Sequence, residues 1–371
     1  MALRTNAFVA DQVVVSSGRS GEALVGTSNE LTGLEEVVMA TPNFLSQYRR
    51  QAAPEILPRE WHLTDINVAG AWRITTGRPE IVVAVLDDGV DMDHPNLRPN
   101  LCAALGRDFF LPDGDPDQFN ARPKRFQFPF DQMKGNDLHG TSCAGLVAAG
   151  GLAGGAVGVA PGCLILPVKI FHADDLAADE RVADAIRYAA RHADILSCSW
   201  TCGASPDIRL ALEDAGQGRG GRGAAVFCAA GNDAGGPVCF PAREPGAIAV
   251  GASTDQARRA GFSNVGPELS VVAPSSGGLR GIFTTAVSGP HRSLDGPHTD
   301  RFGGTSAATA LAAGTAALVL SANPAFNREE LKDLLESTAD KIAGSYDTRG
   351  HNDEMGCGRV NAGKAVLRAT E

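Results

Sequence analysis

The chain has 371 residues, a formal net charge of −10 at pH 7 and a hydrophobic share of 43%. The negative charge and the aromatic content of only 6% exclude a general nucleic-acid binder, because such proteins need a basic face and aromatic side chains on which bases stack. Glycine is frequent, at 44 residues, which indicates many tight turns. The length allows one large domain or two to three smaller ones.

No run of about 18 apolar residues is present, so we expect no membrane span. The first residues, MALRTNAFVADQVVVSS, do not resemble a signal peptide, because Asp11 and Gln12 interrupt the apolar stretch. We therefore expect a cytoplasmic protein, or a secreted one if a leader is missing from the sequence. The eight cysteines are sparse and mostly lie in apolar runs, so we expect buried thiols and no disulfide framework.

Residues 1–53 differ from the rest, with short β-like runs at 13–15 and 36–39 between turn-rich segments. From residue 54 onward, apolar runs alternate with helical patterns. Strands are predicted at 81–86, 164–170, 195–199, 224–229 and 248–250, and helices at 139–149, 179–192, 205–215, 305–321, 327–339 and 361–370. This alternation predicts an α/β fold: a doubly wound, mostly parallel sheet with helices on both faces. Ligands of such sheets bind at the carboxyl ends of the strands.

Two segments interrupt this pattern. Residues 107–136 are rich in Asp, Pro and Phe without a clear period, and we interpret them as a functional or mobile insertion loop. Residues 216–223, GQGRGGRG, are interpreted as a surface turn. They contain the G-x-G-x-x-G pattern of dinucleotide sites, but they precede a strand instead of following one, which argues against nucleotide binding.

Three segments carry reactive side chains at a strand end or a helix start. Asp87 ends the first buried strand, His139 precedes an apolar helix, and Ser306 opens a long Ala-rich helix. Each residue alone could be a turn, core or capping residue. Together they form a chemical set, because a serine hydroxyl needs a base to act as a nucleophile, histidine supplies that base, and a carboxylate orients it. Asn232, after a fourth apolar strand, could supply the amide donor that a tetrahedral intermediate needs.

The order Asp, His, Asn, Ser resembles that of the subtilisin-like serine peptidases of the S8 class, with features similar to the kexin-like branch. The segments that carry the resemblance are VAVLDDGVDMDHPNL (83–97), HGTSCAG (139–145), GVAPG (158–162), SCSW (197–200), AAGN (229–232) and GGTSAATALAAG (303–314). The resemblance implies that Asp87 orients His139, that His139 is the general base and then acid, and that Ser306 attacks. It also implies that Asn232 and the Ser306 backbone N–H hold the oxyanion. Two departures are Ala310, where the family has a proline, and Ser142, where it has a second histidine.

The resemblance divides the chain into a shortened propeptide-like segment, 1–53, and a catalytic domain, 54–371. By the same resemblance, the N-terminal segment is a candidate intramolecular inhibitor of the zymogen. Substrate-binding residues are expected at Asp88, where kexin-like enzymes receive a basic P2 side chain, and along the strand edge formed by Ser199, Trp200 and Thr201. Cys239 and Phe240 are expected at an S1 pocket for an apolar or medium-sized side chain.

Calcium is the one cofactor that the sequence suggests, and no organic cofactor is expected. Asp108, Asp115 and Asp117 in the insertion offer carboxylate ligands of the type that Ca²⁺ prefers, although a solvated acidic loop is an equal alternative. The calcium site typical of the family is doubtful, because Asn96 stands where an aspartate ligand is common and the loop 150–158 lacks the usual asparagine.

The sequence therefore predicts a serine endopeptidase that hydrolyses polypeptides through an acyl-enzyme. Two alternatives share the fold. One is a transpeptidase or macrocyclase that passes the acyl group to an amine, since water exclusion depends on the shape of the pocket. The other is an inactive binding scaffold.

Overall fold

The computed structural model describes residues 2–5, 13–16, 29–31, 34, 54–111, 115, 120–123, 138–171, 177–288 and 296–371. The chain forms two compact units, Met1–Ala52 and Ala53–Glu371. In the first unit, strand β1 (Ala2–Thr5) pairs antiparallel with β2 (Val13–Ser16), and residues 29–31 are helical. The predicted β-like run at 36–39 lies outside the described residues.

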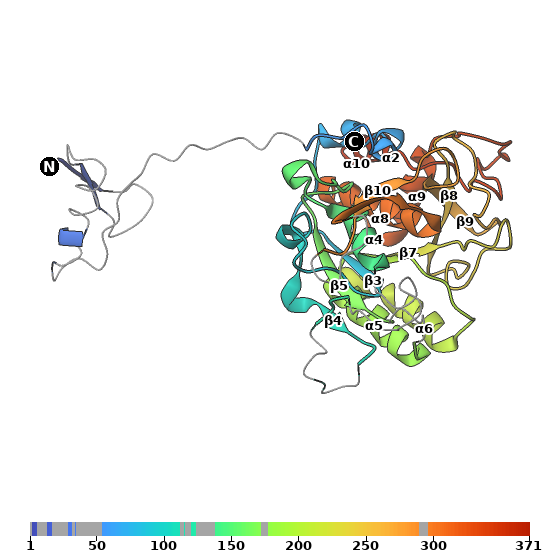
Figure 1. Ribbon diagram of the computed structural model, residues 1–371, viewed down its shortest axis with the longest axis horizontal. Coiled ribbons are helices and arrows are strands. Elements are labelled where there is room, and N and C mark those ends of the chain that lie inside the picture. The colour runs from blue at the N-terminus through green and yellow to red at the C-terminus, as the bar shows by residue number, and fades with distance from the viewer. Residues whose placement is uncertain are drawn as a thin grey trace. The chain divides into compact units, whose positions relative to one another are not determined.

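The second unit is built on a seven-stranded sheet in which every neighbouring pair is parallel (Figure 1). The strands in sheet order are β4 (Arg107–Asp108), β5 (Leu164–Lys169), β3 (Val82–Asp87), β6 (Ile195–Cys198), β7 (Ala225–Ala229), β8 (Ile248–Ser253) and β9 (Leu269–Pro274). Apolar side chains alternate between the two faces of the central strand β3: Val83 and Val85 join one buried cluster, and Ala84 and Leu86 join the other. Both faces are therefore covered, as parallel sheets require.

Helices lie on both faces of the sheet, which confirms the doubly wound α/β fold. One face packs against α4 (His139–Ala148) and α8 (Gly304–Ala322), and the other against α5 (Asp179–His192) and α6 (Pro206–Ala215). The remaining helices are α2 (Trp61–Asp65), α3 (Val68–Trp72), α7 (Gly218–Gly221), α9 (Arg328–Thr338) and α10 (Ala362–Ala369). The 3-10 helices are η1 (Arg98–Asn100), η2 (Ala103–Leu105) and η4 (Leu152–Gly154).

Local sequence explains where several helices begin. Pro206 follows the N-cap Ser205 of α6, and α9 begins with a capping box between Asn327 and Glu330. Helix α4 differs, because its N-cap residue Leu138 provides no side-chain acceptor. The first backbone amides of α4 must therefore find acceptors elsewhere.

Helix α8 forms the centre of the core. Its residues from Thr305 to Ser321 are all buried, although by length and composition it is the one helix of the described residues that could cross a membrane. Because it packs against β6, β7, β8 and β9, α8 is a core helix of the folded unit.

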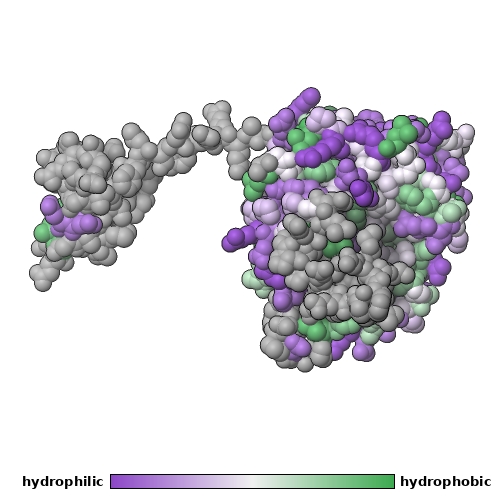
Figure 2. Space-filling view, in the orientation of Figure 1, coloured by the Kyte–Doolittle hydropathy of each residue, from purple (hydrophilic) through white to green (hydrophobic). Residues whose placement is uncertain are grey.

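The described surface in Figure 2 mixes hydrophilic residues with small, separate hydrophobic groups.

A two-stranded antiparallel sheet packs over α4. It consists of β10 (Ile282–Thr285) and β11 (His298–Phe302). A Cβ at Gly145 would lie 2.1 Å from Thr285 Oγ1, so only glycine lets α4 approach β10 this closely. The Thr285 hydroxyl donates a hydrogen bond to Thr141 O, at 2.7 Å. These contacts join α4 to the segment that leads into α8.

The predicted strands and helices of residues 81–370 are present, with ends that differ by a few residues. Strand β9, the β10–β11 pair and the helices α2 and α3 were not predicted, and β4 lies at the start of the segment 107–136, which was interpreted as a loop. The segment 216–223 was expected to be a plain turn, but it contains the short helix α7, within which Arg219 and Gly220 adopt left-handed backbone angles.

Candidate active site

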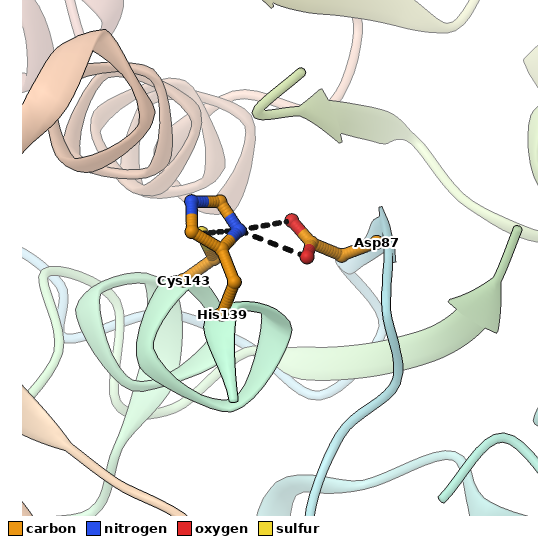
Figure 3. Close-up of side chains that lie close together, drawn as sticks. All are labelled: Asp87, His139 and Cys143. Atoms are coloured by element: carbon orange, nitrogen blue, oxygen red, sulfur yellow. Dashed lines mark hydrogen bonds and ion pairs between the residues drawn. The ribbon is translucent and has the colours of Figure 1, made fainter. Parts of the chain in front are cut away.

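Asp87 and His139 meet at the carboxyl end of the sheet (Figure 3). Asp87 is the last residue of β3 and His139 is the first residue of α4. The imidazole Nδ1 lies 2.9 and 3.0 Å from the two carboxylate oxygens, and the Asp87 side chain is 1% exposed. A buried carboxylate in this position orients the imidazole with its proton on Nδ1.

The opposite nitrogen of His139, Nε2, points away from Asp87 in Figure 3 and has no hydrogen bond among the described residues. The His139 side chain is 36% exposed, and Phe302 packs beside it with ring centroids 5.3 Å apart. Burial disfavours the imidazolium, but the negative charge of Asp87 opposes burial and raises the pKa of His139 well above 6.5. An imidazole held in this way can accept a proton at Nε2.

Ser306 lies in the first turn of α8 and is 8% exposed. Its hydroxyl donates to Ser199 O at 3.0 Å, and the Ser199 hydroxyl donates to Ser306 O at 3.1 Å. No hydrogen bond between Ser306 and His139 is formed among the described residues. The hydroxyl turns on a single Cα–Cβ bond, however, and catalytic hydrogen bonds are often formed only when substrate is bound.

The side chain of Asn232 is held by the start of the same helix. Its Oδ1 accepts from Thr305 N at 2.9 Å and from Thr305 Oγ1 at 3.1 Å. These two contacts fix the plane of the amide, and Asn232 Nδ2 makes no hydrogen bond within the described part of the chain. The exposed Nδ2 and the Ser306 N–H, which belongs to the first turn of α8, are therefore donors available to a ligand.

Cys143 lies one turn after His139 on α4, with Sγ 3.7 Å from His139 Nδ1 (Figure 3). Burial raises the pKa of this thiol, with the charge of His139 opposing the shift. Asp87, His139 and Cys143 are the one group of metal-ligand side chains found within 4.8 Å of one another in the described residues. The same Nδ1 atom is already hydrogen-bonded to Asp87, so we interpret the group as an orienting pair with a neutral thiol beside it.

Asp88, predicted to bind substrate, lies against the start of α4. Its side chain is 5% exposed and accepts hydrogen bonds from the backbone amides of His139 and Gly140, at 2.9 and 2.7 Å. Burial and the neighbouring charge of Asp87 raise the pKa of Asp88 to about 7. The carboxylate thus faces α4, and both of its oxygens are used within the protein.

The other predicted substrate-binding residues fall into two groups. Ser199, Trp200 and Thr201 follow β6, with Ser199 bound to Ser306, Trp200 Nε1 donating to Leu86 O at 3.0 Å, and Thr201 exposed. Phe240 is 2% exposed, so its ring belongs to the core. Cys239 is partly exposed, and its thiol donates to Asp233 at 3.3 Å.

The acidic insertion is only partly described. Asp108 is buried, and its Oδ1 accepts from Phe110 N at 2.9 Å. Asp115 is half-buried. Asp117 lies outside the described residues. Carboxylates suit a calcium ion, and calcium at this loop stays a prediction from the sequence.

The side chains around the loop 150–158 do not fit a calcium ion. Asn96 is 2% exposed. Its Nδ2 donates to Leu152 O at 3.0 Å, and its Oδ1 accepts from His298 Nε2 at 3.1 Å and Ala156 N at 3.2 Å. Arg59 donates to Gly154 O at 3.1 Å. Because an amide N–H and a guanidinium already satisfy carbonyls of this loop, those oxygens are not free to coordinate a cation.

All eight cysteines are free thiols, and only half of them are buried as predicted: Cys143, Cys163, Cys198 and Cys228. Three residues of the site region were not predicted from the sequence. Phe302 packs on His139, Thr305 holds Asn232, and the fully buried Lys169 donates to Asp88 O. Thr305 stands inside the quoted motif GGTSAA, but nothing in the sequence signals that Phe302 or Lys169 would reach the site.

Comparisons with known proteins identify the family of the chain. Residues 78–358 match the model of the subtilase family. A calcium-dependent protease of Trichormus variabilis is 31% identical over an alignment that covers 95% of this chain and 57% of the relative. The chain thus spans less than two thirds of that protein. Subtilisin BL of Lederbergia lenta is 30% identical, with 82% of this chain and 98% of the relative covered.

A solved structure described as proteases from Pseudoalteromonas arctica PAMC 21717 matches with a TM-score of 0.70 and 26% identity, covering 84% of this chain and 97% of that chain. The kexin-like branch is not tested by these comparisons and stays a prediction. The matched family model spans most of the chain, including all the segments that carried the resemblance. The chain belongs to the subtilase family of serine peptidases.

Proposed function

We propose that this chain is a serine endopeptidase in which Ser306 is the nucleophile, His139 the general base and acid, and Asp87 the orienting carboxylate. The observation that carries the proposal is the hydrogen-bonded pair of Asp87 and His139 at 2.9 Å, two residues 52 positions apart in sequence. The imidazole of His139, whose Nε2 has no partner among the described residues, packs against Phe302. Phe302 lies two residues before α8, the helix that carries Ser306.

In the proposed reaction, His139 Nε2 takes the proton of Ser306 Oγ as this oxygen attacks the scissile carbonyl. The imidazolium is stabilised by Asp87, and it then gives the proton to the leaving amine as the C–N bond breaks. The product of this half-reaction is an ester of Ser306. Water attacks the ester with His139 again as base, which releases the acid and restores the hydroxyl.

Asn232 Nδ2 and the Ser306 backbone N–H are the proposed donors to the oxyanion. Thr305 fixes the amide of Asn232 before substrate arrives, and donors that need no reorganisation are the most effective in stabilising developing charge. The adjacent first turn of α8 adds a favourable positive potential.

The substrate proposed is an extended polypeptide that pairs with residues 199–201 by β-augmentation. The hydroxyl of each of Ser199 and Ser306 donates to the backbone carbonyl of the other. A substrate backbone paired with this edge would therefore lie next to the proposed nucleophile. Cys239 stays a proposed S1 residue because its side chain is partly exposed, whereas buried Phe240 would shape the pocket from behind.

The test is covalent labelling of the full chain with a fluorophosphonate probe, beside Ser306→Ala. We expect labelling of the wild type alone, and a loss of peptide cleavage of about 10⁶-fold in the variant. Equal melting temperatures would show that the variant is folded. Labelling of both proteins, or of neither, would contradict the assignment.

Mass spectrometry of the products separates the alternatives that share the fold. Hydrolysed peptides are expected, with one ¹⁸O incorporated at the new carboxylate in labelled water. Joined or cyclic peptides would identify a transpeptidase or macrocyclase. A folded wild type that turns over no peptide would identify a binding scaffold.

Two further parts of the proposal concern regulation and calcium. Residues 1–53 are proposed as an intramolecular inhibitor, and N-terminal sequencing of purified wild type and Ser306→Ala would show whether the enzyme removes them itself. Calcium is proposed at Asp108, Asp115 and Asp117, where it would stabilise the loop without taking part in the chemical steps. Two relatives bear the name calcium-dependent protease, which supports a calcium requirement.

A further inference from the structure

The Asp88 carboxylate caps a helix to which it does not belong. The first amides of an α-helix have no partner inside the helix, and Leu138 offers α4 no side-chain acceptor. Asp88 Oδ2 accepts from His139 N at 2.9 Å and Oδ1 accepts from Gly140 N at 2.7 Å. A carboxylate at this end also interacts favourably with the helix dipole.

Asp88 is itself held on its other side. Its backbone N–H donates to Asp87 Oδ1 at 2.9 Å, and its carbonyl accepts from the ammonium of Lys169. Lys169 is fully buried and is the register partner of Asp87 on β5. The capping carboxylate is therefore anchored to the centre of the sheet.

The packing between α4 and the end of β3 leaves no room for a side chain at Gly140. A Cβ on Gly140 would lie 2.4 Å from Gly89 O and 2.8 Å from Asp87 Cβ. The backbone of His139 is thus placed by direct contact and by the two hydrogen bonds to Asp88. A shift of that backbone would move the imidazole away from Asp87.

We propose that Asp88 is a positioning residue, which sets the place of His139 relative to Asp87 by capping α4, and that it does not bind the P2 side chain of the substrate. This inference rests on the proposed function of His139. Each oxygen of Asp88 already accepts a hydrogen bond from a backbone amide, and the residue is only 5% exposed, so little of the carboxylate is accessible to a basic side chain of the substrate.

The kinetic test compares Asp88→Ala, which removes both acceptors, with Asp88→Asn, which keeps one. We expect kcat to fall by roughly 100-fold in the alanine variant and less in the asparagine variant, because displacements of about 1 Å cost rates of this order. KM should stay near the wild-type value. Asp91→Asn is the matched control, since Asp91 is also buried but its Oδ2 accepts from Ser288 N and Oγ.

Substrate selectivity separates positioning from binding. We compare two peptides that differ only in having Lys or Ala at P2. The Asp88→Ala variant should cleave both with a kcat reduced by the same factor, so the ratio of their kcat/KM values should equal that of the wild type. A loss confined to the P2-Lys peptide would overturn the proposal. So would an alanine variant whose kcat lies within twofold of Asp91→Asn.

A spectroscopic measurement tests the positioning without turnover. The Nδ1 proton shared by His139 and Asp87 should give a low-field NMR resonance in the full chain, and Asp88→Ala should shift or broaden it while Asp91→Asn leaves it in place. An unchanged resonance in Asp88→Ala would overturn the proposal. If the wild type cleaved no peptide but the resonance still moved, the proposed function would fall and the positioning role would stand.

Discussion

Two polar clusters of the catalytic unit differ in what they leave unbonded. In the cluster around Asn96, both side-chain polar atoms of this residue form hydrogen bonds within the protein, and the neighbouring His94 forms hydrogen bonds through both ring nitrogens. At the candidate active site, His139 Nε2, Asn232 Nδ2 and the Ser306 N–H have no hydrogen-bond partner among the described residues. Satisfied groups stabilise a fold, whereas preorganised groups without partners are available to a reacting ligand.

Among the variants that test this comparison, the largest effect is expected from Asp87→Asn. The amide would leave the shape of the site intact but favour the wrong tautomer of His139, and kcat should fall by about 10⁴-fold. Steady-state kinetics on one peptide would measure this loss. A loss below tenfold would show that the Asp87–His139 hydrogen bond does not serve catalysis. The inference that the groups without partners in this cluster are catalytic would then fail.

Asn232→Ala tests Asn232 Nδ2, one of the donors without a hydrogen-bond partner among the described residues. Removing one oxyanion donor should lower kcat by about 10² to 10³-fold and change KM little. Thr305→Val is a useful companion, because it removes the hydroxyl that holds Asn232 Oδ1 and keeps Asn232 itself. We expect an intermediate loss in this companion. Unchanged kcat in Asn232→Ala would contradict the assigned role.

Asn96→Asp tests the satisfied cluster. The carboxylate would face Leu152 O in place of an N–H donor, and we expect a loss of stability of about 1 to 3 kcal/mol when calcium is chelated. Calcium should restore more of the melting temperature in this variant than in the wild type, because a carboxylate among carbonyl oxygens suits the ion. Asn96→Ala should be destabilised equally with and without calcium. Equal calcium responses in Asn96→Asp and the wild type would contradict this interpretation.

The smallest expected effect concerns pH. The base must be neutral, so kcat/KM should rise with pH through the pKa of His139. Because the folded protein raises this pKa well above 6.5, the rising limb should lie on the alkaline side of that value. A pH–rate profile measures the midpoint, and a midpoint at or below pH 6.5 would show that the charge of Asp87 does not act on His139 as inferred.

The sequence predicted most of the catalytic unit because strong patterns mark its core. Strands such as β3 and helices such as α8 are long apolar runs, and the resemblance indicated Asp87, His139, Asn232 and Ser306. Strand β9 (Leu269–Pro274) was not predicted. The β10–β11 pair was missed because β11, HTDRF, is polar and short, and because β11 pairs with β10 while β10 contacts α4, which periodicity does not reveal.

Asp88 shows what a family resemblance leaves out. The resemblance predicted a substrate contact for this residue, and it gave no sign that its carboxylate accepts hydrogen bonds from amides 51 and 52 residues away. A capping residue is usually sought next to the helix it caps. Only the fold, which brings the end of β3 against the start of α4, reveals the long-range contact.

The burial of α8 from Thr305 to Ser321 has a practical consequence for measuring the proposed activity. Ser306 stands in the first turn of a helix that packs against the sheet and against α4, α9 and α10, so we expect the proposed nucleophile to keep its place until the unit unfolds. Heat inactivation should therefore follow cooperative unfolding of the catalytic unit, and titration of reactive serines would count intact molecules directly.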